Sequence, residues 1–177
     1  MPQFRLPLAR ELVAYWKSRQ INDGIPHTSD FFDHLPAPLA PYLILFDWSP
    51  DDIICRLLGT KLVERWAEDL TGKSWFSANP HLKASGIVAN FKMMIDRPCG
   101  GHAHGSFVST VGRHLSIETV SLPLAVSPGR APRVVAGSFP VETLGTDERS
   151  RGWIPPRQLE WLDLGFGIPD RPPAAAA

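Results

Sequence analysis

The sequence predicts an α+β fold in which an N-terminal helix precedes two strands, a short helix, a longer helix and three further strands. Three observations predict this order: two apolar runs joined by turn residues, segments with helical spacing of apolar side chains, and three later runs separated by glycine and proline. The chain has 177 residues, which is long enough for one domain with a hydrophobic core. We therefore expect one folded domain built around an antiparallel sheet.

The composition argues against several classes of function. Acidic and basic residues balance at 18 each, so no net charge favours nucleic acid or an anionic membrane. No apolar run approaches the roughly 20 residues of a membrane span, and the first residues lack a signal-peptide pattern. Cys55 and Cys99 form neither a disulfide framework nor a zinc spacing. We expect a soluble cytoplasmic protein that binds neither nucleic acid nor a membrane.

An amphipathic helix is expected to begin near Pro7, because proline is favoured at the first helical position. Four large apolar residues share one face at i, i+4, i+7 and i+8: Leu8, Leu12, Tyr15 and Trp16. The Asn-Asp-Gly sequence at residues 22–24 is expected to end this helix, and the prolines up to Pro41 exclude a long second one. Residues 1–41 are interpreted as a helix and a proline-rich cap.

A β-hairpin is predicted next. Residues 42–48 and 53–58 are apolar runs, and the Ser-Pro-Asp-Asp sequence between them is typical of a turn. A four-residue loop pairs Trp48 with Ile53. This register places four residues on one face of the sheet: Ile44, Phe46, Cys55 and Leu57. It places the alternate residues on the other face: Leu45, Asp47, Ile54, Arg56 and Leu58.

The second half of the chain alternates between helical and strand patterns. A short helix is expected at 61–66, and a longer one from Asn79 and Pro80 to Arg97. Apolar residues of the longer helix follow helical spacing: Ala84, Ile87, Val88, Phe91, Met94 and Ile95. Three strands are predicted at 102–110, 114–124 and 133–143. Residues 146–177 are interpreted as a C-terminal extension with an apolar piece at 159–164, and 169–177 are expected to be disordered.

These motifs resemble those of a known family. A hairpin that runs through Arg56, Gly59 and Thr60 into a short helix, followed by Asp-Leu-Thr-Gly-Lys at 69–73, resembles the opening half of a PAS domain. The N-terminal helix also resembles that of the bacterial group in which one PAS-like domain makes up nearly the whole protein. The resemblance implies a PAS-like five-stranded antiparallel sheet over residues 42–145, with helices on one face plus an N-terminal capping helix.

The resemblance implies a sensory or regulatory module and not an enzyme. It places a small-molecule pocket between the long helix and the inner face of the sheet, and output through a signalling protein partner. The residues predicted to contact a ligand are Phe46, Leu57, Trp75, Phe91, Met94, His102, His104 and Glu118. The cofactor, if any, is unknown: no cysteine is placed for a flavin adduct, and no histidine stands out as a heme ligand.

His102 and His104 lie on one face of a strand, because side chains alternate with a period of two. A three-residue loop at 111–113 would place Glu118 on that face, and a two-residue loop would place it on the other. Two histidines and one carboxylate are the most that can gather, so we expect no metal site. In the rival hypothesis these three residues line the cavity of a small cone-shaped α+β enzyme or ligand carrier. The strand order distinguishes the two hypotheses.

A homodimer is also predicted, because the second face of the sheet is more apolar than a solvated face. The residues expected at this dimer or partner face are Leu8, Leu12, Tyr15, Trp16, Leu45, Ile54 and Leu58. Two copies that meet there would bury both apolar stripes by two-fold symmetry. The alternative is a monomer whose own helix and tail, through Trp153 and Trp161, cover the face.

Overall fold

A computed structural model of the chain describes residues 3–22, 24–109, 111–146, 152–154 and 159–174. Its strands are β1 (Leu43–Trp48), β2 (Ile53–Leu58), β3 (Gly100–Val108), β4 (Arg113–Leu124), β5 (Arg133–Thr146), β6 (Gly152–Ile154) and β7 (Leu159–Leu162). Its α-helices are α1 (Pro7–Ser18), α2 (Thr28–Asp33), α3 (Thr60–Trp66), α4 (Trp75–Ala78) and α5 (Ile87–Asp96). Two 3₁₀ turns are η1 (Ala40–Tyr42) and η2 (Pro80–Ala84).

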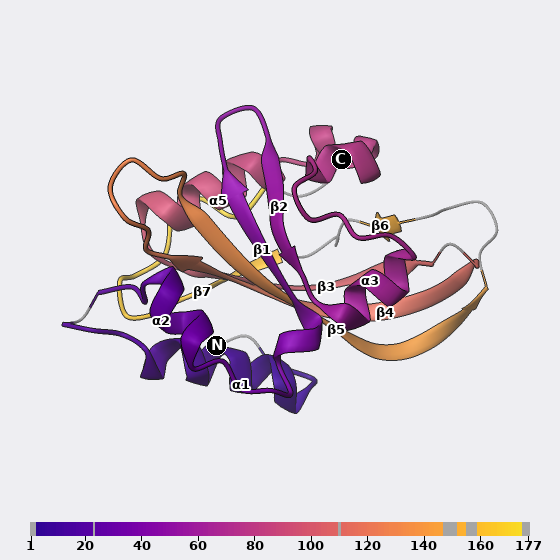
Figure 1. The fold of residues 1–177 in the computed structure, drawn as a ribbon, viewed down its shortest axis with the longest axis horizontal. Helices are drawn as coiled ribbons and strands as arrows, with labels where there is room; N and C mark the ends of the chain where they lie inside the picture. Colours follow the sequence, from indigo (N-terminus) through magenta and orange to yellow (C-terminus); the bar gives the residue numbers. More distant parts are fainter. Residues whose placement is uncertain (1–2, 23, 110, 147–151, 155–158, 175–177) are drawn as a thin grey trace.

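One antiparallel sheet forms the middle layer of the molecule, with α1 and α2 on one side and α5 on the other (Figure 1). The strand order is β2-β1-β5-β4-β3-β6, and β7 also pairs with β3. The first strand therefore lies next to the last of the five predicted strands, as a PAS sheet requires, and the predicted α+β fold class is confirmed. The sheet has seven strands instead of five, because the C-terminal extension adds β6 and β7 along β3.

The hairpin of β1 and β2 forms, and the residue pair next to the turn is the predicted one. At the end away from the turn, however, the residues of β2 face the opposite sides from those predicted. Trp48 pairs with Ile53, whereas a register shift beyond Phe46 pairs Ile44 with Leu58. An extra residue in β2 of this kind is a β-bulge, and it reverses the facing of every residue after it. Leu58 is consequently buried with Ile44, and Leu57 is exposed on the opposite face.

Helix α1 covers the second face of the sheet within the same chain. Leu12 and Trp16 are fully buried, and the Trp16 indole Nε1 donates a hydrogen bond to the Pro123 carbonyl at 2.8 Å. Leu45 belongs to the same core, and Leu8 and Tyr15 pack against it. The face predicted for a homodimer is therefore not exposed. Residues predicted there that do not belong to this core are Ile54, which is half-buried, and Leu58, which faces the other way.

The long helix predicted from Pro80 to Arg97 is broken. The first part is the 3₁₀ turn η2, and α5 begins only at Ile87. Gly86 separates them with a positive φ of 72°, a conformation that glycine adopts without steric cost. The apolar spacing continues across the break, which is why the sequence predicts one helix. The break brings the first turn of α5 toward the C-terminal segment of the chain.

The C-terminal extension packs against the domain where the structure describes it. Trp161 joins the core on the α5 side of the sheet, and its Nε1 donates a hydrogen bond to the Arg171 carbonyl at 2.9 Å. In the stretch that was expected to be disordered, the Arg171 and Ala174 backbones form hydrogen bonds with Trp161 and Asn90. Residues 175–177 lie outside the described part of the chain, as does residue 151 before β6.

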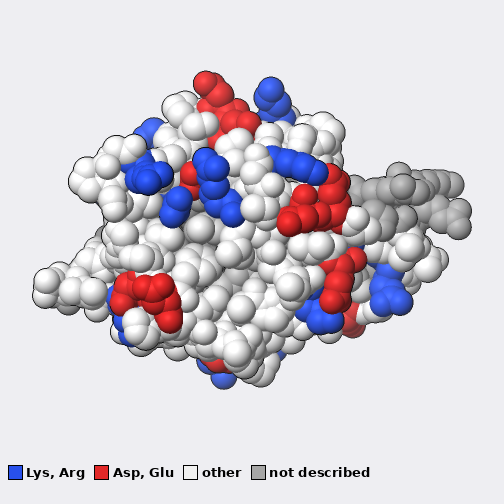
Figure 2. Space-filling model, viewed as in Figure 1, with Lys and Arg blue, Asp and Glu red and all other residues white. Residues whose placement is uncertain are grey.

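Charged side chains of both signs are interspersed over the face in Figure 2, in keeping with the balanced composition. Within the described part of the chain, none of the helices has the length and apolar character needed to cross a membrane.

Candidate functional site

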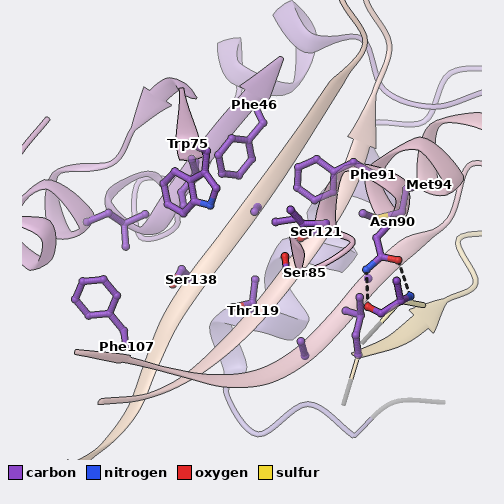
Figure 3. A pocket seen from close by; sticks show the side chains of 18 of the residues that line it. Phe46, Trp75, Ser85, Asn90, Phe91, Met94, Phe107, Thr119, Ser121 and Ser138 are labelled. Carbon is purple, nitrogen blue, oxygen red and sulfur yellow. Dashed lines mark hydrogen bonds between the residues drawn. The ribbon is translucent and has the colours of Figure 1, made fainter. Parts of the chain in front are cut away.

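A cavity of about 90 Å³ lies between α3, α4 and α5 and the inner face of the sheet (Figure 3). The residues that line it come from nearly every part of the domain: Phe46 from β1, Trp75 from α4, Phe91 and Met94 from α5, Ala103 and Phe107 from β3, Thr119 and Ser121 from β4, and Ser138 from β5. Most of these side chains are apolar. The cavity therefore resembles a ligand site, which is typically concave and apolar with a few polar groups.

Aromatic rings form one continuous wall of the cavity. The Trp75 ring contacts Phe46 at a centroid distance of 5.1 Å and Trp66 at 5.3 Å, in both cases edge to face. Trp66 in turn contacts Phe107 at 4.7 Å. Ser74 caps α4, the helix that begins with Trp75, because its hydroxyl accepts a hydrogen bond from the Phe76 amide. Rings held at both edges give the wall a defined shape.

Two polar atoms at the cavity are buried without a partner. They are the indole Nε1 of Trp75 and the hydroxyl Oγ1 of Thr119, and neither makes a hydrogen bond to any described residue. Figure 3 shows the Trp75 nitrogen turned toward the strands that carry Thr119 and Ser138. Buried polar groups are nearly always hydrogen-bonded, and each unsatisfied one costs about 1–3 kcal/mol. An indole donor and a hydroxyl therefore stand ready for a polar group inside the cavity.

Arg65 is the charged residue among the described residues that line the cavity. Its Nη1 donates a hydrogen bond to the Ser138 hydroxyl at 3.0 Å, and its Nη2 lies 3.4 Å from the Ser138 carbonyl oxygen. The guanidinium carbon lies 5.7 Å from the centre of the Phe107 ring. Burial lowers the pKa of Arg65 to about 10, because the charged form loses hydration there. Arg65 is the strongest electrostatic feature of the cavity.

Asn90 fastens the C-terminal segment at another part of the cavity wall. Its Nδ2 donates to the Ala174 carbonyl at 3.0 Å, and its Oδ1 accepts from the Ala174 amide at 2.8 Å. The two bonds, drawn in Figure 3, pair one side-chain amide with one residue of backbone. Ala174 itself lines the cavity. The last described residue of the chain thus forms part of the wall.

Four of the residues predicted to contact a ligand line this cavity: Phe46, Trp75, Phe91 and Met94. The other four do not. Leu57 lies on the opposite face because of the bulge in β2. His102, His104 and Glu118 also face away, because their neighbours Ala103 and Thr119 point into the cavity and strand side chains alternate.

His102, His104 and Glu118 form a separate cluster beneath the N-terminal segment. Glu118 is fully buried, and its Oε1 accepts from the Arg5 amide at 2.9 Å and lies 2.8 Å from His102 Nε2. Its Oε2 accepts from the Leu6 amide at 2.8 Å. Leu6 is the residue that precedes the first turn of α1. The carboxylate therefore anchors the start of α1 to the sheet.

Within the cluster, Glu118 and His102 are hydrogen-bonded, whereas the buried Nδ1 of His104 has no hydrogen-bond partner among the described residues. The ring of Phe4 packs edge to face on His102, with centroids 5.0 Å apart. His104 is directly opposite Glu118 across β3 and β4, with 3.9 Å between His104 Nε2 and the carboxylate. One nitrogen from each histidine and one Glu118 oxygen lie within 4.8 Å of one another. Both carboxylate oxygens already accept hydrogen bonds, and the absence of a metal stays a prediction.

The two cysteines are buried outside the cavity lining. Burial raises the pKa of the Cys55 thiol to about 11, and that of the Cys99 thiol likewise to about 11. Both thiols are therefore protonated at neutral pH, which is unfavourable for nucleophilic chemistry.

The sequence patterns did not point to Arg65, Thr119, Ser138, Asn90 and Ala174, all of which line the cavity. One of them carries a local signal: Arg65 is three residues after the inward-facing Leu62, and helical periodicity would have placed it on the inner side. Strand alternation pointed Thr119 to the other face, because its neighbour Glu118 was predicted to face the pocket. The positions of Ser138 and Ala174 depend on contacts between distant parts of the chain.

Comparison with known proteins adds one finding. A family model described as a PAS domain matches residues 5–138. No protein with a curated description and no solved structure matches the chain. The narrower resemblance to the bacterial stand-alone group stays a prediction. The family match covers more than half of the sequence and includes α1, β1 to β4 and most of the cavity lining, so the chain belongs to the PAS-domain family.

Proposed function

We propose that the chain is a sensory or regulatory PAS module that binds a small molecule in the cavity between α5 and the sheet. The observation that carries the proposal is the pair of unpartnered polar atoms there, Trp75 Nε1 and Thr119 Oγ1. A purely structural core would be expected to leave neither a void nor unsatisfied donors. Family membership alone supports only the general role, because one fold serves many functions.

The proposed output is a change in contacts with a signalling protein. The cavity touches α3, α4, α5 and the C-terminal segment, so a ligand that repacks any of these would alter the outer surface above them. A ligand shifts such an equilibrium only through different contacts in the two states. The two hydrogen bonds between the Asn90 side chain and the Ala174 backbone are contacts that would differ between the two states.

A cavity-filling variant tests the proposal. Ala103 lies in the cavity wall, so Ala103→Leu would occupy much of the space. Native mass spectrometry of the protein after incubation with cell extract is expected to show a retained small molecule that Ala103→Leu loses. Ala37→Leu makes the same change at an exposed position and is expected to retain the molecule.

The contrary result is a protein that retains nothing, together with a higher melting temperature for Ala103→Leu. The space would then be a packing defect that a larger side chain repairs. In that case the regulatory role would depend on partner contacts alone.

A further inference from the structure

Arg65 has no counter-ion among the described residues. No carboxylate in the described part of the chain forms an ion pair with it, and its hydrogen bonds go to the neutral hydroxyl and carbonyl of Ser138. By contrast, Arg56 and Arg133 both pair with Asp47, at 2.6 and 2.8 Å. Arg65 therefore differs from Arg56 and Arg133, because it faces a cavity and has no carboxylate partner among the described residues.

An arginine in this position costs stability in the unliganded protein. Burial removes water from the guanidinium, and neutral acceptors replace only part of the lost interaction. An anion within the cavity would form the charge-assisted hydrogen bonds that Ser138 leaves open, because guanidinium has five N–H donors. The burial that lowers the pKa of Arg65 would then strengthen its attraction for the anion.

The Trp75 indole and Ser138 would contribute to the binding site for the same anionic group. Arg65 and Trp75 both line the cavity, and the rings of Phe107 and Trp66 lie in sequence between them. Figure 3 shows Ser138 between Trp75 and Phe107. The indole N–H is a donor without a partner, as an anion requires.

We propose that the ligand is a small organic carboxylate, with its anionic group held by Arg65 and the Trp75 indole and its apolar body directed toward Phe91 and Met94. The inference rests on the proposed function, because it assigns a chemical class to the ligand of the same cavity. A phosphate ester would fit less well, since its larger and more hydrated group would displace more of the aromatic wall.

The volume limits the size of the apolar body. An apolar cavity of about 150 Å³ takes up benzene. The present cavity, at about 90 Å³, is smaller, so carboxylates with fewer non-hydrogen atoms than benzene, such as propionate, are the ones that fit without rearrangement. Release of Ala174 from Asn90 would open the wall to longer acids.

Propionate and its neutral isostere propionamide test the inference. Each is titrated into ¹⁵N-labelled protein at pH 7 and constant ionic strength, and the Trp75 indole N–H signal, assigned with Trp75→Phe, is followed by NMR. Propionate is expected to bind with a Kd at least about tenfold lower than that of propionamide, which corresponds to about 1.4 kcal/mol.

Three variants test the role of Arg65. Arg65→Gln is expected to abolish the preference for propionate, and Arg65→Lys to retain part of it, because the charge remains. Arg97→Gln is the matched control, since Arg97 also donates to a carbonyl but lies outside the cavity lining. Melting curves establish that each variant is folded before titration.

The outcomes separate this inference from the proposed function. Equal affinities for propionate and propionamide, or a preference that survives in Arg65→Gln, would overturn the anion inference and leave a ligand cavity in place. If neither probe shifts the Trp75 signal and Ala103→Leu melts higher than the parent, both proposals are wrong.

Discussion

A substitution that removes the Thr119 hydroxyl tests whether the cavity is adapted to bind a ligand. The hydroxyl oxygen is buried without a hydrogen-bond partner among the described residues, so Thr119→Val is expected to leave the free energy of unfolding unchanged or raise it by up to about 1 kcal/mol. Urea denaturation measures the change. Thr28→Val is the matched control, because the Thr28 hydroxyl donates to the Ala125 carbonyl at 2.8 Å. The control is expected to lose about 1 kcal/mol, and an equal loss at Thr119 would point to an unseen partner.

His104 is expected to make stability depend on pH. Burial lowers the pKa of His104, the electrostatic effects of His102 and Arg5 lower it further, and Glu118 and Glu160 oppose this only in part. Since the folded protein disfavours the protonated ring, this contribution to stability is full above the ordinary value of about 6.5 and is lost as the pH falls from there through the lower pKa of the folded protein.

The expected result is a lower melting temperature at pH 5 than at pH 7.5, with a smaller decrease in His104→Gln. Differential scanning calorimetry at both pH values makes the comparison, and the pH 7.5 melt of each protein serves as its own reference. A variant with the same decrease as the parent would show that another group causes it.

At the scale of elements, the carboxylate of Glu118 joins α1 to the sheet. Glu118→Gln replaces one acceptor oxygen with an amide NH₂, so the Arg5 amide, the Leu6 amide or His102 loses its acceptor. A loss of about 2–3 kcal/mol in the free energy of unfolding is expected.

The exposed pair of Lys61 and Glu64 supplies the control for this prediction. Glu64→Gln removes a surface ion pair and is expected to change the free energy of unfolding by less than about 0.5 kcal/mol. Urea denaturation monitored by tryptophan fluorescence serves for both variants. Equal effects would show that Glu118 contributes no more than a surface carboxylate.

Asn90 and Ala174 form the second junction between distant elements. Asn90→Ala removes both hydrogen bonds to the Ala174 backbone, so amide exchange at Ala174 is expected to accelerate about tenfold. Asn90→Asp retains an acceptor for the Ala174 amide and is expected to give a smaller increase. Hydrogen exchange by NMR makes the measurement. Unchanged exchange in Asn90→Ala would show that other contacts hold the segment.

The elements that were predicted correctly from the sequence are those that local residue patterns determine. The turn at residues 49–52 and the alternation in β3, β4 and β5 each specify their own strands, and the resemblance gives their order. The bulge in β2 and the break at Gly86 are single-residue departures, and the apolar spacing on either side conceals them. The site itself joins α3, the strands and Ala174, and no local pattern records which of these segments meet.

The whole molecule is expected to be a monomer. The apolar face predicted to dimerise is covered by α1 of the same chain. The large apolar side chains that remain exposed in the described residues come from separate segments: Ile21, Leu57, Val111, Leu144 and Ile168. Isolated apolar residues of this kind are ordinary on protein surfaces. Sedimentation velocity at micromolar concentration is expected to give 19.6 kDa, and twice that mass would indicate a dimer through another face.

The pairing of β6 and β7 along β3 bears on how the protein is handled in the laboratory. β7 pairs with Gly100–Ala103 and β6 with Ser106–Val108, so together they occupy the backbone N–H and C=O groups of that edge. Open edges recruit strands from neighbouring copies. A version of the chain shortened after Thr146 is therefore expected to aggregate, even though the family match ends at 138.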